Sequence, residues 1–177
     1  MNGIIYRDVT PADAAGLADV LVHANESAFR GRVPDVCLEF SEAESSANWQ
    51  RFFADGGLPS GDFMIVSQAS SGRVVGYTWG GLFPPDTNYR GEVRQLAVHP
   101  DYHRQGIGRR LVQMVAARLA RRDCHSLRVD VLEANPNRAF YERLGAVYVG
   151  ESPYDWEGVT LTSYTYGWAD TAALIAG

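Results

Sequence analysis

Residues 92–113 read EVRQLAVHPDYHRQGIGRRLVQ, in which a β-rich run leads into two glycines one residue apart. The run at 92–98 predicts a strand, and apolar side chains at every fourth position from Ile107 to Leu119 predict a helix that packs on a sheet. A helix start presents free backbone N–H groups and the positive end of the helix dipole, and glycine lets a ligand approach the backbone closely. The segment therefore predicts a strand–loop–helix unit that binds a phosphate-bearing ligand.

Three ligand classes compete for this loop. A Walker-type loop requires Lys followed by Ser or Thr after its last glycine, and Arg109 with Arg110 at that place excludes it. A dinucleotide-binding loop requires a third glycine, where this chain has Leu111, although Asp130 lies near the distance expected for its ribose-binding acid. That loop and a glycine turn without a ligand remain the alternatives to the third class, coenzyme A.

The order of predicted elements indicates a single mixed α/β domain over residues 1–177. Thr10 before Pro11 is typical of a helix start, and Ser41 with Glu44 forms a capping box. The sequence contains no repeat, low-complexity tract or linker-like segment. We expect the order β, α, α, β, β, β, α, β, α, β, β. Strands are expected at 4–9, in a hairpin over 61–81, and at 92–98, 126–133, 146–151 and 159–168. Helices are expected at 11–28, at 42–54, after the glycines and at 135–145, and a loop is expected at 84–91.

Composition narrows the classes of function. A net charge of −5 argues against general nucleic-acid binding, yet six of the 16 basic residues lie between Arg104 and Arg122, which indicates a small anionic ligand held locally. The sequence has no apolar run of membrane-spanning length and no signal-peptide pattern at its start, so we expect no membrane association. Cys37 and Cys124 are far apart, and we expect two reduced thiols in a cytoplasmic protein. We expect no metal site, because neither the cysteines nor the four histidines show ligand spacing.

The glycine segment and its surroundings resemble a known family. HRQGIG at 103–108 resembles the Q/R-x-x-G-x-G/A signature of the GNAT superfamily of N-acetyltransferases, with His103 where Gln or Arg is usual. VRQLAVHPDY before it resembles the family's central strand, and VLEANPNRAFYERLGAVYVGE at 131–151 resembles its second signature segment. The resemblance covers nearly the whole chain. It implies the α/β GNAT fold, a central, mixed, mostly antiparallel sheet whose fourth and fifth strands are parallel and splay apart, with helices on both faces.

The resemblance also implies acetyl-CoA as the co-substrate and direct acetyl transfer to a primary amine in a ternary complex. The pantetheine arm is expected to enter the gap between the splayed strands and to pair with the backbone of the fourth, where an N–H at Ala97 or Val98 would grip the thioester carbonyl. His103 can still donate a hydrogen bond, because backbone N–H groups supply most of the grip on the pyrophosphate. The implied cofactor-binding residues are Leu96, Ala97, Val98, His103, Arg104, Gln105, Gly106, Ile107, Gly108, Arg109, Asn135, Asn137 and Tyr141.

Two side chains are candidates for the proton transfers that the resemblance implies. Tyr141 is the candidate acid for the leaving thiolate, and the alternative is a tyrosine that only packs between helix and sheet. Glu92 is the candidate base, directly or through water, and the alternative is a rim carboxylate that only attracts cations. Strict alternation would place Glu92 on one face of its strand with the other even-numbered residues up to Val98. Glu133, at the end of the next strand, is the reserve base.

The acceptor site is expected between two segments, at 29–35 and 152–158. The second segment carries two aromatic and two acidic side chains at 154–157, which suit a cationic amine, whether a small molecule or a peptide. Polyamine, aminoglycoside, amino-acid and peptide amines all stay open, and a homodimer contact is the other explanation of these aromatic residues. The alternative function is a GNAT-like domain that binds acyl-CoA without catalysis and serves as a sensor or interaction module.

Overall fold

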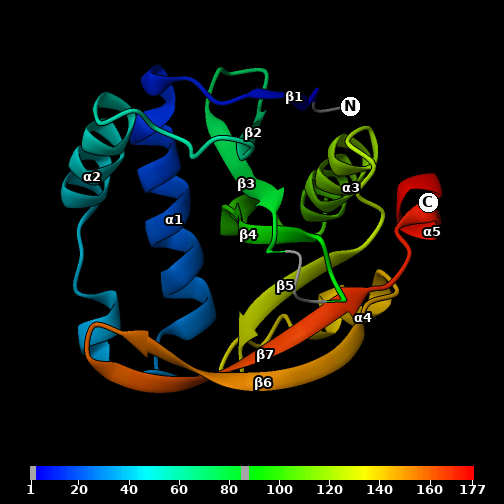
Figure 1. Cartoon of the computed structure of the whole chain (residues 1–177). Coiled ribbons are helices and arrows are strands. Elements are labelled where there is room, and N and C mark those ends of the chain that lie inside the picture. Colours follow the sequence, from blue (N-terminus) through cyan, green and yellow to red (C-terminus); the bar gives the residue numbers. More distant parts are fainter. Residues whose placement is uncertain (1–2, 85–87) are drawn as a thin grey trace.

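The computed structural model describes residues 3–84 and 88–177 and contains one mixed sheet with helices on both of its faces (Figure 1). The predicted loop at 84–91 lies partly outside the described residues. The strands are β1 Ile5–Asp8, β2 Phe63–Gln68, β3 Val74–Leu82, β4 Gly91–Val98, β5 Leu127–Leu132, β6 Val147–Trp156 and β7 Val159–Trp168. The helices are α1 Ala14–Phe29, α2 Glu42–Ala54, α3 Ile107–Ala120, α4 Ala139–Arg143 and α5 Ala172–Ala176, with short 3-10 turns η1 Pro11–Asp13, η2 Asp35–Leu38 and η3 Pro100–Tyr102.

The sheet divides at the junction of β4 and β5. The strand order is β1-β2-β3-β4-β5-β7-β6, and β4 with β5 is the parallel pair among otherwise antiparallel neighbours. Their pairing is confined to three residue pairs, from Gly91 with Leu127 to Val93 with Val129. Beyond these pairs β5 runs away from β4 towards the β6–β7 hairpin (Figure 1). The expected splayed pair and the GNAT-type α/β fold are confirmed.

Helices cover both faces of the sheet and enclose two separate cores. On one face Ile107, Leu111 and Val115 of α3 pack with Val93 of β4. On the other face Leu17 of α1 and Trp49 of α2 pack with Tyr77 of β3 and Ala97 of β4. Each large apolar side chain buried in this way contributes about 1.5–3 kcal/mol to folding. The strand β4 is thus packed between α1 and α3. This packing fixes the position of the segment that follows β4 and leads to the glycine loop.

A β-bulge in β4 corrects the expected alternation. Gln95 pairs with Trp79 and Val93 pairs with Gly80, so one residue of β4 is extra at this point. Val93, Leu96 and Val98 all contact the core beneath α3, whereas Ala97 belongs to the core beneath α1. The expectation that the even-numbered residues share a face therefore holds only for Glu92 and Arg94, and it is wrong for Leu96 and Val98. The extra residue shifts the alternation by one.

The β6–β7 hairpin is longer than expected. We predicted a strand at 146–151 and a loop at 152–158, but β6 continues to Trp156 and pairs with β7 along its whole length. The turn is formed by Glu157 and Gly158, which both have positive φ values, of 51° and 77°. Two such residues make the tight turn that suits the twist of a hairpin. The helix predicted at 135–145 is shorter than expected, because α4 spans Ala139–Arg143.

The end of the hairpin reaches the other half of the molecule. Trp156, Val159 and Leu161 pack against a third buried cluster that includes Phe29 and Cys37. This contact joins the last two strands to the segment after α1. Within the described residues, no helix has the length and apolar character needed to cross a membrane.

Candidate active site

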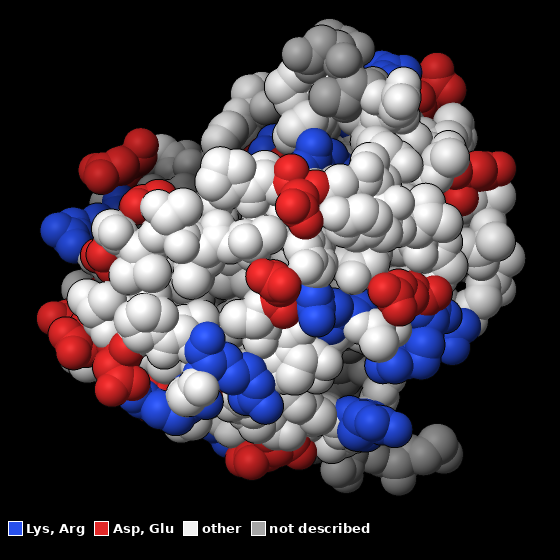
Figure 2. All heavy atoms as spheres, turned by 90° about the horizontal axis from the view of Figure 1, so that it is seen from below, with Lys and Arg blue, Asp and Glu red and all other residues white. Residues whose placement is uncertain are grey.

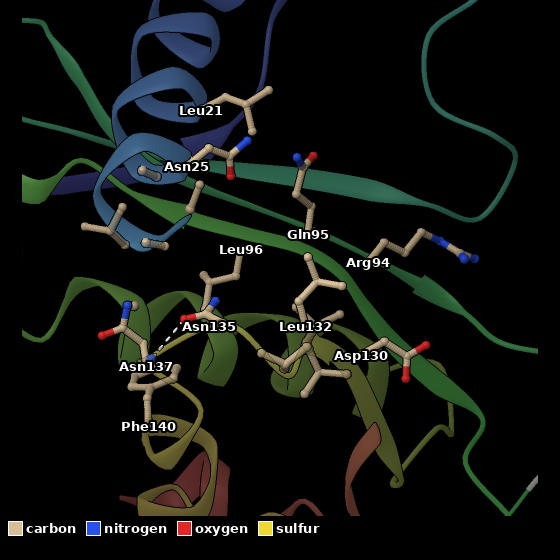
Figure 3. A pocket seen from close by; sticks show the side chains of 18 of the residues that line it. Leu21, Asn25, Arg94, Gln95, Leu96, Asp130, Leu132, Asn135, Asn137 and Phe140 are labelled. Atoms are coloured by element: carbon tan, nitrogen blue, oxygen red, sulfur yellow. Dashed lines mark hydrogen bonds between the residues drawn. The ribbon is translucent and has the colours of Figure 1, made fainter. Parts of the chain in front are cut away.

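A cavity of about 1620 Å³ opens where β4 and β5 diverge (Figure 3). Leu96 of β4 and Leu132 of β5 line it between Asn25 of α1 and the segment that carries Asn137. Sites for one drug-sized ligand usually measure about 300–1,000 Å³. The cavity therefore has room for a cofactor arm and an acceptor together.

The glycine loop lies at one end of this cavity. Gly106 has a φ of 79° and directly precedes α3, whose Arg110 N donates to Gly106 O at 3.0 Å. The N–H groups of Ile107, Gly108 and Arg109 come before this bond, and all three residues line the cavity, although the Ile107 side chain is buried in the core. No heavy atom lies within 4 Å of the place where a Cβ of Gly106 would stand. The loop therefore offers N–H donors beside open space.

Two polar side chains brace the loop. His103 Nε2 lies 2.9 Å from the carbonyl oxygen of Val98, and the ring must carry its proton on Nε2 to donate there. Gln105 Nε2 donates to the carbonyl of Asp101 at 3.5 Å, and Gln105 does not line the cavity, whereas His103 and Arg104 do. The structure therefore brings His103 and Arg104 to the site and places Gln105 outside it.

Asn135 and Asn137 line the wall of the cavity that lies opposite β4 (Figure 3). Asn135 Oδ1 accepts a hydrogen bond from the backbone N of Asn137 at 2.9 Å (Figure 3). This bond forms the turn that leads into α4, so Asn135 partly has the capping role that the sequence left open. Both amides remain on the cavity surface.

Tyr141 combines a packed ring with a place at the cavity. Its side chain is 9% exposed, its ring stacks on Tyr166 with the ring centres 6.2 Å apart, and Phe140 contacts it edge-on at 5.0 Å. Burial raises the pKa of Tyr141 well above the ordinary value for a phenol. The hydroxyl is therefore neutral at physiological pH and holds a proton to donate, and Tyr141 lines the cavity.

Glu92 stands at the far end of the cavity within a network of charges. Its Oε2 lies 2.6 Å from Arg94 Nη1 and its Oε1 lies 3.8 Å from Arg128 Nε. Burial raises the pKa of the carboxyl, although both arginines act in the opposite direction. A carboxylate in this position is a stronger base than one in water.

Comparisons with known proteins agree with this geometry. The model of the acetyltransferase (GNAT) family matches residues 29–146. The chain belongs to the GNAT family. An uncharacterized N-acetyltransferase, YuaI of Bacillus subtilis, is 26% identical over 173 residues, which are 97% of this chain and 96% of that protein.

Solved structures share the fold of this GNAT protein. A putative GNAT acetyltransferase from Desulfovibrio desulfuricans superposes with a TM-score of 0.70 at 18% identity, covering 96% of this chain and all of that one. YncA of Salmonella typhimurium, a putative acetyltransferase solved with acetyl-CoA, superposes with a TM-score of 0.61 at 19% identity, over 94% of this chain and 93% of that one.

The residues of this GNAT protein fit acetyl-CoA on structural grounds. A Cβ at Gly106 would point into the open space beside the helix start, where a pyrophosphate needs to approach. Arg104 and Arg109 line the same end of the cavity and supply positive charge. The backbone of β4 from Leu96 to Val98 also lines the cavity, next to the gap that β5 leaves open.

The reserve base lies outside the site. Glu133 Oε1 accepts a hydrogen bond from Tyr164 Oη at 2.8 Å, and Glu133 does not line the cavity. The acidic residue that does line it on β5 is Asp130, whose carboxylate is bound by Arg128 and Thr165, both at 2.6 Å. From the sequence, Asp130 was a candidate only for the ribose-binding acid of a dinucleotide site.

Between the segments at 29–35 and 152–158, this GNAT cavity is lined by aromatic rings and by one acid, Glu157. Phe29 meets Trp156 edge-on with the ring centres 5.3 Å apart, and both line the cavity. Asp155 does not line the cavity, and its Oδ1 accepts a hydrogen bond from Gly158 N in the hairpin turn at 3.3 Å.

On the face where β6 and β7 lie, acidic and basic side chains are interspersed among uncharged ones (Figure 2).

Several lining residues were missed from sequence because they come from the first two helices. These residues share an apolar or amide side chain, and they are Leu21, Asn25, Asn48, Trp49 and Phe52. An amide such as Asn25 on an otherwise apolar helix face was the available signal.

Proposed function

We propose that this GNAT protein transfers an acetyl group from acetyl-CoA to a primary amine by direct attack within a ternary complex. One observation carries the proposal. The N–H-rich start of α3 and two candidate proton-transfer groups, Tyr141 and Glu92, line a single cavity at the point where β4 and β5 separate. Acetyl-CoA supplies the activated acetyl thioester, and the chain supplies the groups that bind and orient it and move protons.

The glycine loop is the proposed phosphate site. Backbone N–H groups of Ile107, Gly108 and Arg109 would hold the pyrophosphate, with Arg104 and the Arg109 side chain adding charge. The β4 backbone from Leu96 to Val98 would pair with the pantetheine arm, and Asn135 and Asn137 would contact it from the opposite wall. Because His103 already donates a hydrogen bond to the carbonyl of Val98, the neighbouring backbone groups of β4 would make the main contacts with the pantetheine arm.

Two groups at the cavity are the proposed carriers of protons. Glu92, whose pKa is raised by burial, would take the proton from the acceptor ammonium directly or through water. Tyr141 is neutral at physiological pH, as any phenol is, and would protonate the leaving thiolate, although its raised pKa makes it a weaker acid than a phenol in water. A backbone N–H of Ala97 or Val98 would stabilise the negative charge that develops on the thioester oxygen.

We propose an acceptor whose amine is attached to an apolar body, in a small molecule or a peptide. Phe29, Trp49 and Trp156 line the cavity, and two of its acids, the buried Glu92 and the exposed Asp130, are already bound by arginines. A polyamine would need several unpaired carboxylates along its length, and among the described lining residues only Glu157, in the hairpin turn, is a further acid. This narrows the cationic amines that the sequence left open.

Release of the CoA thiol with a panel of amines tests the proposal. We expect thiol release together with a mass increase of the amine by one acetyl group, highest for arylalkyl amines and for peptides with an apolar N-terminal residue. If acetyl-CoA binds but no amine in the panel is acetylated, the protein is the non-catalytic acyl-CoA-binding module that is the alternative.

A further inference from the structure

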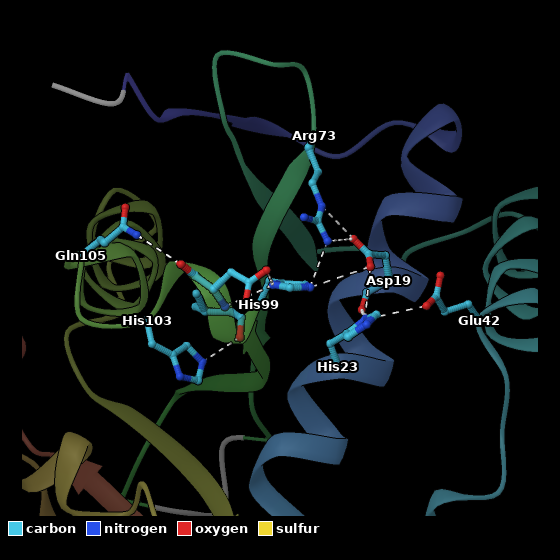
Figure 4. Close-up of polar contacts among 9 residues, drawn as sticks. Asp19, His23, Glu42, Arg73, His99, His103 and Gln105 are labelled. Carbon is cyan, nitrogen blue, oxygen red and sulfur yellow. Dashed lines mark hydrogen bonds and ion pairs between the residues drawn. The ribbon is translucent and has the colours of Figure 1, made fainter.

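We propose that Asp19, His23 and His99 form a binding site for one divalent transition-metal ion of the Zn²⁺ type. Asp19 and His23 lie one turn apart on α1, and His99 directly follows β4 (Figure 4). The site is separate from the acetyl-transfer cavity, which none of these three residues lines. It does not depend on the proposed function.

The three potential ligand atoms are close to the spacing that such an ion requires. They all lie within 4.8 Å of one another. His23 Nδ1 lies 3.2 Å from Asp19 Oδ1, and His99 Nε2 lies 3.9 Å from the same oxygen. His23 Nδ1 also donates to the carbonyl oxygen of Asp19 at 2.9 Å, so metal binding at this nitrogen would release its proton. Four ligands at about 2.0–2.2 Å in a tetrahedron are roughly 3.3–3.6 Å apart. Rotation of the exposed His23 side chain and a small shift of Asp19 towards the buried His99 would bring the three ligand atoms to this spacing.

His99 presents the nitrogen that a metal ion needs. Arg73 Nη2 lies 2.9 Å from His99 Nε2, and a guanidinium can only donate, so Nε2 carries a lone pair. The proton is then on Nδ1, which lies 3.6 Å from Asp101 Oδ2. Asp101 N also lies 3.3 Å from Nδ1. A neutral imidazole has one nitrogen lone pair, however, and we assign that lone pair to Nε2 because the contact with Arg73 is the shorter one. The Asp101 carboxylate is too far away for a hydrogen bond, and a small movement of this exposed side chain would give Nδ1 the carboxylate partner that usually supports a metal-bound histidine.

Arg73 marks the centre of the cluster as a place for positive charge. Its Nη2 bonds to Asp19 Oδ2 at 2.9 Å as well as to His99. Arg73 precedes β3, and its side chain is 41% exposed, so it can move into solvent without disturbing the core. A metal ion would replace this guanidinium and gain the same carboxylate and imidazole.

The cluster also has a route to solvent and a further ligand within reach. The side chain of His23 is 44% exposed, while that of His99 is 5% exposed and held in place. Glu42 Oε1, at the start of α2, lies 3.8 Å from His23 Nδ1. A Glu42 oxygen or a water molecule completes four-coordination. The spacing of cysteines and histidines along the chain gives no sign of this site, because the fold brings a carboxylate together with two distant histidines.

Calorimetric titration of the untagged, chelator-treated protein with Zn²⁺, and the visible absorption spectrum with Co²⁺, test the proposal. We expect one equivalent to bind, His23→Ala to weaken binding by about tenfold or more, and Arg73→Gln to strengthen it because a competing cation is removed. His125→Ala is the matched control, since His125 is an exposed histidine 3.4 Å from the Asp123 carboxylate but outside the cluster.

Two results would overturn the proposal. One is equal binding by the wild type and by His23→Ala, and the other is no binding by the wild type and by Arg73→Gln. Either would make the cluster an ion-pair network that only joins α1 to β3 and β4.

Discussion

The carboxylate of Glu92 is held by the guanidinium of Arg94 at 2.6 Å, and its pKa is nevertheless raised. Burial is the largest cause, and Arg94 followed by Arg128 opposes it. A base must be ionised to work, so kcat/KM should fall as the pH falls through this raised pKa. The ion pair with Arg94 therefore controls how far into acid the proposed enzyme stays active.

Replacing Arg94 by Gln should move the acid limb of the pH–rate profile to higher pH, because one of the charges that favour the carboxylate is lost. The pH profiles of kcat/KM for the wild type and for Arg94→Gln measure this shift. The ionisation of the amine substrate affects both profiles equally and therefore does not contribute to the difference. Glu92→Gln should leave only the ionisation of the amine in the acid limb and lower kcat by about a hundredfold. An unchanged limb in Arg94→Gln would show that Glu92 is not the base.

Replacing Tyr141 by Phe should lower kcat by about a hundredfold and leave the Kd for acetyl-CoA nearly unchanged. The reason is that Phe keeps the ring that stacks on Tyr166 and loses only the proton donor. Tyr148→Phe is the control, since Tyr148 is exposed and does not line the cavity. Parallel losses of kcat and affinity would make Tyr141 a binding or packing residue.

Gly106→Val should abolish acetyl-CoA binding in a protein that stays folded. A side chain at a φ of 79° costs about 1–2 kcal/mol and projects into the open space of the phosphate site. Gly56→Val is the matched control, because Gly56 has a φ of 108°, has equally open surroundings and does not line the cavity. Calorimetry and thermal unfolding separate the effects, and equal affinities in the two variants would contradict the phosphate-site assignment.

His103→Ala should weaken acetyl-CoA binding by about fivefold, the equivalent of one hydrogen bond of about 1 kcal/mol, because the loop loses its link to the carbonyl of Val98. His103→Gln should restore the affinity, since an amide N–H can donate to the same carbonyl. Tighter binding by His103→Ala would mean instead that the imidazole competes with the pantetheine arm for Val98.

Local signals predicted most of the elements. The capping box formed by Ser41 and Glu44 is present, with Ser41 N donating to Glu44 Oε2 at 2.8 Å and Glu44 N donating to Ser41 Oγ at 3.2 Å. The periodic apolar residues of α3 are buried against the sheet as expected. These features depend on neighbours within a few residues, which the sequence displays directly.

The errors arose where distant segments decide the structure. The bulge in β4 depends on its pairing with β3, and it moves Leu96 and Val98 to the face opposite Glu92. The length of β6 depends on pairing with β7 and on packing of Trp156 against the segment after α1. Glu133 was placed near the site by its position after β5, but its side chain turns to Tyr164.

Calorimetric titration with acetyl-CoA, with NAD and ATP as controls, tests the central claim most directly. The account predicts that acetyl-CoA binds with one equivalent per chain and that NAD and ATP do not bind. Binding of NAD, or of none of the three, would contradict the assignment of the cavity between β4 and β5 to acetyl-CoA.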